Sequence, residues 1–211
     1  STAPSFASKW LMPRMDDFHA THPEIEVWIS ADMAPASLDE GKADLAIRYG
    51  PGDYPDLISE RLLGETVLPV CSPRLIEGDT PIRKPSDLIG HPLLHDMSDD
   101  GDPSRPDWAM WLKARGVRHA DARRGSRFNQ SGMAIEAAAA GRGVALTKRT
   151  LAQADLASGR LVAPFADGSE AVAFAYHVVM PRDRPASASV LVFVDWLKQQ
   201  AVHHDNSMGQ L

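Results

Sequence analysis

The chain has 211 residues, 44% of them hydrophobic and 24% charged, so it can bury the core of one large domain or of two lobes of about 100 residues each. No apolar run approaches the ~18 residues of a membrane span, and we expect no membrane partner. The net charge of −6 comes without a stripe of Lys and Arg, which argues against direct binding to DNA phosphates. The single cysteine, Cys71, excludes an internal disulfide and a thiolate metal cluster and favours the cytoplasm.

The first ten residues, STAPSFASKW, have neither the basic nor the apolar region of a secretory signal. They look like the cap of a helix, and we expect the chain to be a fragment of a longer polypeptide. Between Phe6 and Phe18 apolar residues recur at helical spacing, and Pro13 predicts either a bend or a helix that becomes regular near that point.

Two strands are expected next. Residues 25–29 alternate apolar and polar side chains, and a second strand is expected at 43–49, after a short helix or turn. The order helix, strand, helix, strand predicts a parallel sheet covered by helices, with its ligand edge at the carboxyl ends of the strands.

The second half of the chain continues this alternation. We expect a strand at 64–73, a surface loop at 99–107 and a helix from Trp108 onward. A strand at 171–181 and an amphipathic helix at 187–201 close the ordered part.

Residues 137–149, AAAAGRGVALTKR, raise the question of a nucleotide site. In dinucleotide sites the glycines lie between a strand and the start of a helix, where free N–H groups meet the phosphate. Here Gly141 and Gly143 follow a helix, so they predict a helix stop and a turn into the next strand. The end of this helix that suits an anion is its start, where Asn129 or Ser131 is the expected cap.

The pattern predicts two subdomains. The first comprises residues 1–68 and 178–200, and the second comprises 69–177. We expect residues 201–211 to be a disordered tail.

No catalytic pattern is present: the sequence lacks G-x-S-x-G, H-E-x-x-H, C-x-x-C and Walker motifs, so it predicts no catalytic residue, no metal site and no cofactor. His91 and His95 are four residues apart, but Pro92 breaks the helix that would align them as metal ligands. Cys71 lies in an apolar strand, where a small buried side chain is commoner than a redox sensor.

Four blocks occur in the order and spacing of one known family: PSFASKWLMPRMDDFHATHPEIEV, LDEGKADLAIRYG, LPVCSPRL and AAAAGRGVALTKRTLAQADLASGRLVAPF. Together they resemble the effector-binding domain of LysR-type transcriptional regulators, over nearly the whole chain up to about Gln200. The segments PLLHD, WAMWLKARG and RFNQSGMAIEAAAAGRGVAL resemble the branch of the glycine-cleavage activator and the regulators of β-lactamase induction.

The resemblance implies an α/β fold of the periplasmic-binding-protein type 2 kind, with two Rossmann-like subdomains joined by two crossing strands and a small-molecule inducer in the cleft between them. It implies a homodimer or homotetramer whose interface includes Trp10, Met15 and Phe18. DNA would be bound only through an N-terminal winged helix-turn-helix that is missing here. The strand that precedes TAPSFA in the family is also largely missing, so the first lobe should lack its central strand or begin with a frayed one.

The resemblance also implies which residues line the inducer cleft. The first lobe should supply Thr2, Ser5, Asp32, Arg48 and Tyr49, and the second should supply Asn129, Gln130, Ser131, Thr147, Tyr176 and His177. We expect about half of them to touch the ligand, since pockets use few well-placed polar groups. Ser5 and Ser131 could instead cap helices, Asp32 could form a turn, Arg48 could pair at the surface and Tyr176 could belong to the core.

The leading hypothesis is therefore an inducer-sensing regulatory domain, not an enzyme, that binds a small carboxylated metabolite and alters the arrangement of an oligomer. Two alternatives stay open on the sequence alone. One is a solute-binding protein of a transporter, and the other is an enzyme that acts on a small acid on the same scaffold.

Overall fold

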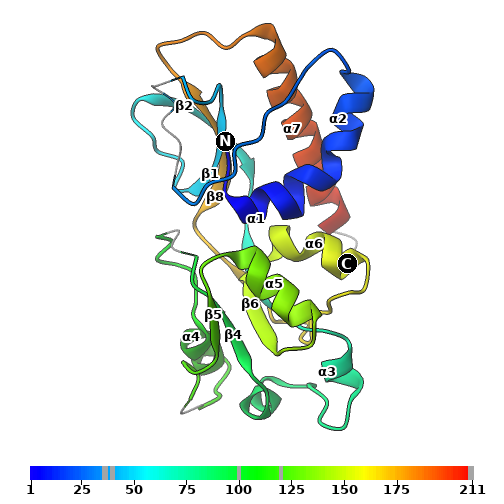
Figure 1. Ribbon diagram of the computed structural model, residues 1–211. Helices are drawn as coiled ribbons and strands as arrows, with labels where there is room; N and C mark the ends of the chain where they lie inside the picture. Colours follow the sequence, from blue (N-terminus) through cyan, green and yellow to red (C-terminus); the bar gives the residue numbers. More distant parts are fainter. Residues whose placement is uncertain (35–37, 39–40, 99–100, 119–120, 209–211) are drawn as a thin grey trace. The chain divides into compact units, whose positions relative to one another are not determined.

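The computed structural model describes residues 1–34, 38, 41–98, 101–118 and 121–208. The chain divides into two compact units (Figure 1): unit 1 is Ser1–Gly64 with Phe174–Leu211, and unit 2 is Glu65–Ala173. The chain passes between the units at Gly64–Glu65 and at Ala173–Phe174. Both crossings come a few residues before the boundaries expected after positions 68 and 177.

Unit 1 begins with a helical stretch. It consists of α1 (Pro4–Phe6), a π-helical turn (Ala7–Leu11), a 3₁₀ turn (Met12–Arg14) and α2 (Met15–Thr21). The irregular turns surround Pro13, whose ring nitrogen cannot donate to a preceding carbonyl. The expected helix is confirmed, and it becomes regular just after this proline.

The sheet of unit 1 has the order β1-β8-β2, with β1 at Ala46–Gly50, β2 at Leu57–Leu63 and β8 at Ala175–Pro181. Both pairings are antiparallel, so the expected parallel sheet is wrong for these strands. The reason lies in the returning strand, which inserts between β1 and β2 after more than half of the chain has intervened. Local element order cannot reveal such a pairing.

The segment 25–29, expected to be a strand, forms no ladder. Thr2 makes isolated parallel bridges to Ala31 and Ile47, and its N–H donates to Ser30 O at 3.0 Å. Ser1 and Thr2 thus lie between the segments 30–32 and 45–47. Their pairing does not reach the segment 25–29. At the position of the expected first strand the described chain therefore has only these isolated bridges.

Helix α7 (Ala188–Met208) packs with α2 through aromatic side chains (Figure 1). Phe18 contacts Phe193 and Trp196 at ring-centroid distances of 5.0 and 5.2 Å. Trp10, Met15 and Phe18 are at most 4% exposed within unit 1, so their expected role in a subunit interface is wrong: their burial is already complete in one chain.

The predicted disordered tail is wrong for residues 201–208, which continue α7. Ala201 and His204 are 4% and 2% exposed, and the His204 ring lies edge-on to Trp10 at 6.4 Å. Ala201 and His204 therefore extend the buried face of α7. The two adjacent histidines hide this helical pattern in the sequence. Residues 209–211 lie outside the described part of the chain.

Unit 2 holds a five-stranded sheet of order β5-β4-β6-β3-β7. Its strands are β3 (Thr66–Val70), β4 (Leu93–Asp96), β5 (Ser126–Phe128), β6 (Val144–Lys148) and β7 (Glu170–Ala171). The pairs β4–β5 and β4–β6 are parallel, whereas β3 pairs antiparallel with both β6 and β7. The parallel expectation therefore holds for one half of this sheet only.

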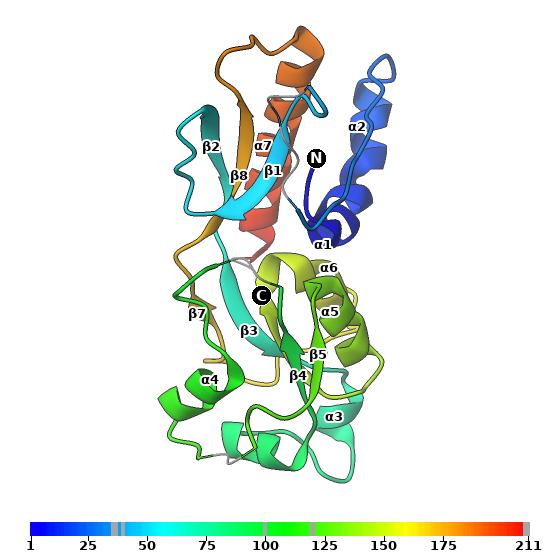
Figure 2. The same cartoon turned by 60° about the vertical axis from the view of Figure 1, so that its left-hand side comes forward.

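The helices of unit 2 are α3 (Arg74–Glu77), α4 (Trp108–Ala114), α5 (Ser131–Ala139) and α6 (Arg149–Ala157), with a 3₁₀ helix at Pro85–Gly90. Helices α5 and α6 lie side by side (Figures 1 and 2). The core around α4 contains Trp108 and Trp111, which pack with Val144 and Leu146 of β6.

The two glycines after α5 have the structural role expected from their order. Gly141 has φ of 75° just past the helix, and Arg142 N donates to Ala137 O at 3.0 Å, which closes the C-terminal turn. A Cβ on Gly143, where φ is 151°, would lie 2.3 Å from Pro92 O. Gly143 is required because β6 approaches the backbone just before β4.

Candidate functional site

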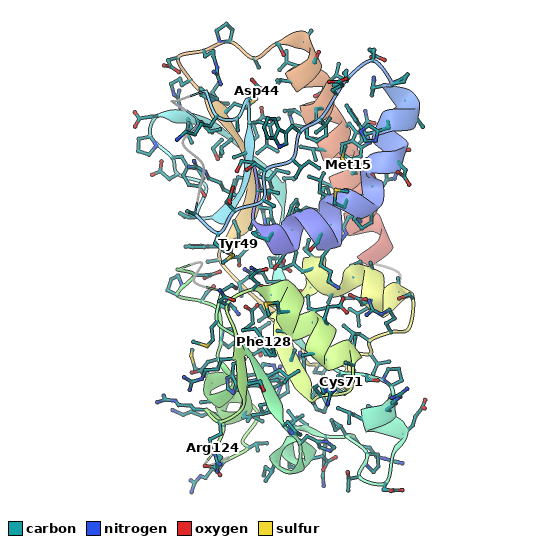
Figure 3. All side chains as sticks on the ribbon, viewed as in Figure 1. Met15, Asp44, Tyr49, Cys71, Arg124 and Phe128 are labelled. Carbon is teal, nitrogen blue, oxygen red and sulfur yellow. The ribbon has the colours of Figure 1, made fainter. Side chains whose placement is uncertain are left out.

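The start of α5 brings polar side chains together in unit 2. Figure 3 labels Phe128, the last residue of β5, from which the chain passes into α5. Ser131 is 2% exposed, and its Oγ lies 3.2 Å from Ser98 Oγ. Asn129 is exposed and Gln130 is half-buried. The expected side-chain cap is wrong: the N-cap is Gln130, with no side-chain bond to the helix, because Ser131 is already the first helical residue and its hydroxyl turns to Ser98.

Arg105 binds Ser98, the residue whose hydroxyl lies next to that of Ser131. Its guanidinium pairs with the Asp96 carboxylate at 3.1 Å, and the side chains are 12% and 0% exposed. It also donates to Asp96 O at 2.8 Å and to Ser98 O at 3.1 Å. A buried ion pair with extra hydrogen bonds holds its geometry firmly. Arg105 therefore ties Ser98 to the end of β4, and the Ser98 hydroxyl meets Ser131 at the start of α5.

No sequence pattern marks Arg105 or Ser98 as a site residue. Arg105 lies within a run of Asp, Gly, Pro and Ser, and these residue types predict a surface loop. The one available signal is an Arg spaced nine residues after the strand-ending Asp96, which becomes meaningful only once the loop is known to fold back.

Thr147 lies in β6 opposite Leu68 of β3, and it is 0% exposed. Its hydroxyl has no hydrogen-bond partner within the described residues. At the end of the same strand, Lys148 is 4% exposed and precedes α6. The structure thus places Thr147 inside unit 2, on β6, which pairs directly with β4; Ser98 follows β4 by two residues.

In unit 1, the strand register puts Arg48 beside His177, and His177 beside Arg61. Directly paired residues share a face of the sheet, so these three form a row of basic side chains. The Arg48 guanidinium lies 5.3 Å from the Tyr54 ring centroid. Burial lowers the pKa of His177, a hydrogen bond with Ala175 O opposes this, and the charge of Arg61 lowers it further. The ring is thereby kept neutral near pH 7.

Tyr49, labelled in Figure 3, pairs with Tyr176, so these two lie on the opposite face from Arg48 and His177. Their rings are 5.0 Å apart, and Tyr176 also packs on Phe6 at 4.5 Å. At 3% exposure Tyr176 belongs to the aromatic core of this unit. The structure therefore separates the expected residues of β1 and β8 into two groups.

Tyr176 and His177 were assigned to the second lobe, and this is wrong. Both lie in β8, the central strand of the unit 1 sheet. The chain crosses back to unit 1 at Ala173–Phe174, before β8 begins, and not within the strand.

The remaining expected residues of unit 1 surround its first turn. The Thr2 hydroxyl donates to Ile47 O at 3.2 Å and Ser5 is 8% exposed. Asp32 is exposed, and its Oδ2 accepts from Ser30 Oγ at 2.8 Å. Thr2 thus joins the N-terminal residues to β1, and the backbone N–H of Asp32 donates to Thr2 O at 3.1 Å.

None of the described helices is long and apolar enough to cross a bilayer. Within the described residues no three His, Cys, Asp or Glu side chains are grouped as metal ligands would be. Cys71 is 0% exposed, and burial raises the pKa of its thiol to about 11.

Comparisons with known proteins agree over almost the whole chain. The family model of the LysR substrate binding domain matches residues 1–202. The glycine cleavage system transcriptional activator of Escherichia coli (strain K12) is 37% identical over 201 residues, which cover 95% of this chain and 64% of that protein. The HTH-type transcriptional activator AmpR of Pseudomonas aeruginosa is 30% identical over 198 residues, 93% of this chain and 63% of the relative. The chain thus spans about 64% of the length of these curated relatives.

Solved structures give the same result. The AmpR effector binding domain from Citrobacter freundii superposes with a TM-score of 0.77 at 28% identity and 96% coverage of both chains. The effector domain of AmpR of Pseudomonas aeruginosa gives 0.76 at 27% identity, covering 98% of this chain and 96% of the other. The expected α/β fold of the periplasmic-binding-protein type 2 kind is confirmed, and the chain belongs to the family of LysR substrate-binding domains.

Proposed function

We propose that this chain is the effector-sensing part of a DNA-binding LysR-type regulator, and that it binds a small carboxylated metabolite. The observation that carries the proposal is the polar cluster at the start of α5, where the Ser131 and Ser98 hydroxyls meet on the support of the Arg105–Asp96 pair. A few polar groups fixed by a rigid support are what a site for a small polar ligand requires. The positive end of the α5 dipole favours a negatively charged ligand group there.

Unit 1 has groups of its own that suit a carboxylate. Arg48 is half-buried, and the positive charges of Arg48 and Arg61, which lie in one row with His177 between them, would attract a carboxylate. Arginine binds carboxylates through two parallel hydrogen bonds, which fixes orientation as well as charge. We propose that Ser131 and Arg48 are the principal effector contacts, with Thr2, Ser5, Asp32, Tyr49, Asn129, Gln130, Thr147, Tyr176 and His177 as the further candidates.

The consequence of binding would be regulatory rather than catalytic. The relatives are named as transcriptional regulators, and they are longer than this chain, so we propose that DNA binding resides in a winged helix-turn-helix outside it. We also propose a cytoplasmic homodimer or homotetramer. An effector can change its arrangement only by binding one arrangement more tightly than the other.

A thermal-shift screen tests the proposal. The purified chain is mixed with amino acids including glycine, with small organic acids and with peptidoglycan fragments. A ligand at 100 times its Kd stabilises the folded state by about 2.7 kcal/mol, which is a readily measured rise in Tm. We expect one class of carboxylated compound to raise Tm and its uncharged amide analogue not to. A panel in which no acid raises Tm would contradict the proposal.

A further inference from the structure

Glu65 is the first residue of unit 2, and it connects three segments. Its Oε1 accepts from the N–H of Thr66 at 2.9 Å and from the N–H of Thr150 at 3.2 Å. Thr150 is the second residue of α6, whose own N-cap, Lys148, makes no side-chain cap. The backbone oxygen of Glu65 accepts from Val172 N at 3.4 Å, close to the return crossing. Glu65 therefore caps α6 from the position just before β3, and it links its own crossing segment to Val172 beside the other.

The return crossing has an anchor of its own. Ala173, the last residue of unit 2, donates its N–H to Ser104 Oγ at 2.6 Å. The Ser104 hydroxyl donates in turn to Asp102 Oδ1 at 2.6 Å, and Ser104 N donates to the same oxygen at 2.9 Å. Ser104 is thus held in place by its own loop.

These anchors reach two of the effector contacts expected in unit 2, Ser131 and Thr147. Ser104 is followed by Arg105, which holds Ser98 against Ser131 at the start of α5. Glu65 holds the start of α6, three residues after Thr147. A continuous path of hydrogen bonds and adjacent residues therefore runs from each contact to a crossing segment.

We propose that Glu65 and Ser104 are positioning residues that transmit the state of the effector site in unit 2 to the two crossing segments. The inference rests on the proposed function, since it concerns the regulation of the same site. Coupling of this kind requires that both ends of the path bias one structural element. Here that element is the pair of crossing segments, since Val172 and Ala173 are consecutive and are held by Glu65 and Ser104 respectively.

Amide hydrogen exchange and chemical shifts of the ¹⁵N-labelled chain test the Ser104 branch without any ligand. Ser104→Ala removes the acceptor of Ala173 N–H, and we expect exchange at Ala173 to accelerate about fivefold to tenfold. Ser131→Ala should shift the Ala173 amide resonance in the parent chain and no longer in the Ser104→Ala background. The matched control is Ser126→Ala, an exposed serine of β5, which should leave Ala173 unchanged. A Ser131→Ala effect at Ala173 that is absent, or equal in both backgrounds, would overturn this branch.

The Glu65 branch is tested by comparing two substitutions. Glu65→Gln keeps a carbonyl oxygen for the two N–H groups, and Glu65→Leu removes it. We expect Thr150 exchange near the parent rate with Gln and about tenfold faster with Leu. If the leucine variant does not fold, a pH titration of the parent chain tests the same point. The amide chemical shifts of Thr150 and Val172 should change together with the ionisation of the Glu65 carboxyl, whose charged neighbour is Lys148. Glu65→Gln should abolish that change. Equal exchange in both variants, or no shared titration, would overturn this branch.

The two proposals fail separately. A thermal-shift panel without a hit would remove the effector and leave the Ala173 and Thr150 measurements intact. Loss of the coupling in a chain that still binds an acid would remove only the transmission through Glu65 and Ser104.

Discussion

Replacing Glu65 by glutamine should change how the stability of the protein depends on pH. Glu65 is 6% exposed, and burial raises the pKa of its carboxyl group from an ordinary 4.5 to about 7. The amide N–H groups of Thr150 and Thr66 and the charge of Lys148 favour the ionised form but do not outweigh burial. In the unfolded chain the same group ionises near its ordinary value.

The sign follows from proton binding. Between pH 4.5 and 7 the folded state holds a proton that the unfolded state has released, so the free energy of unfolding falls as pH rises through this window. A shift of about 2.5 units corresponds to about 3 kcal/mol in full, since one unit is about 1.4 kcal/mol. Of this, about 2 to 3 kcal/mol should be lost between pH 5 and pH 8 in the parent and not in Glu65→Gln.

Urea denaturation at several pH values measures the difference directly. The two curves of unfolding free energy against pH should converge toward pH 5 and separate toward pH 8, with Glu65→Gln the more stable at high pH. Glu77→Gln, an exposed glutamate of α3, is the control and should run parallel to the parent. Parallel curves for parent and Glu65→Gln across the whole range would refute the reasoning.

Three further outcomes follow from packing and burial. Gly143→Ala should lower the free energy of unfolding, measured by urea denaturation, by more than about 2 kcal/mol, because the new Cβ would lie 2.3 Å from a backbone oxygen. Gly90→Ala, whose Cβ would have nothing within 4 Å, should change it by less than about 0.5 kcal/mol. Equal losses in the two variants would contradict this. Trp196→Phe removes the 2.8 Å hydrogen bond from the indole Nε1 to Asp17 and should lower stability by about 1–2 kcal/mol, which unchanged Tm would disprove. Cys71 should react with iodoacetamide at pH 7.5 on the order of 100-fold more slowly in the folded chain than in urea, because the thiol is buried and protonated; equal rates would show that it is accessible.

The sequence predicted those parts of the fold that depend on neighbouring residues. The helix stop at Gly141 and the strand that follows Gly143 come from local spacing and glycine chemistry, and the structure contains both. The same holds for the helix that starts at Trp108, where Asp107 caps the first turn by accepting from Met110 N.

Long-range pairing could not be predicted in the same way. The position of β8 between β1 and β2 depends on a return of the chain after unit 2, so the antiparallel sheet and the placement of Tyr176 and His177 in unit 1 were missed. The strand register then decides which side chains share a face, and it separates Arg48 from Tyr49. The contacts of Glu65 and Arg105 could not be predicted from local spacing, because Glu65 accepts from Thr150, 85 residues away, and Arg105 donates to Asp96, 9 residues away. Charged side chains are also usually solvated, so neither residue stands out in the sequence.

Calorimetric titration of the acid that gives the largest thermal shift tests the central claim most directly. The account predicts saturable one-to-one binding to the parent chain, weakened at least about tenfold by Ser131→Ala and by Arg48→Gln, since each removes a polar contact to a charged group. Ser126→Ala should bind like the parent. An acid that binds all four chains with the same Kd would contradict the proposal that Ser131 and Arg48 contact the effector.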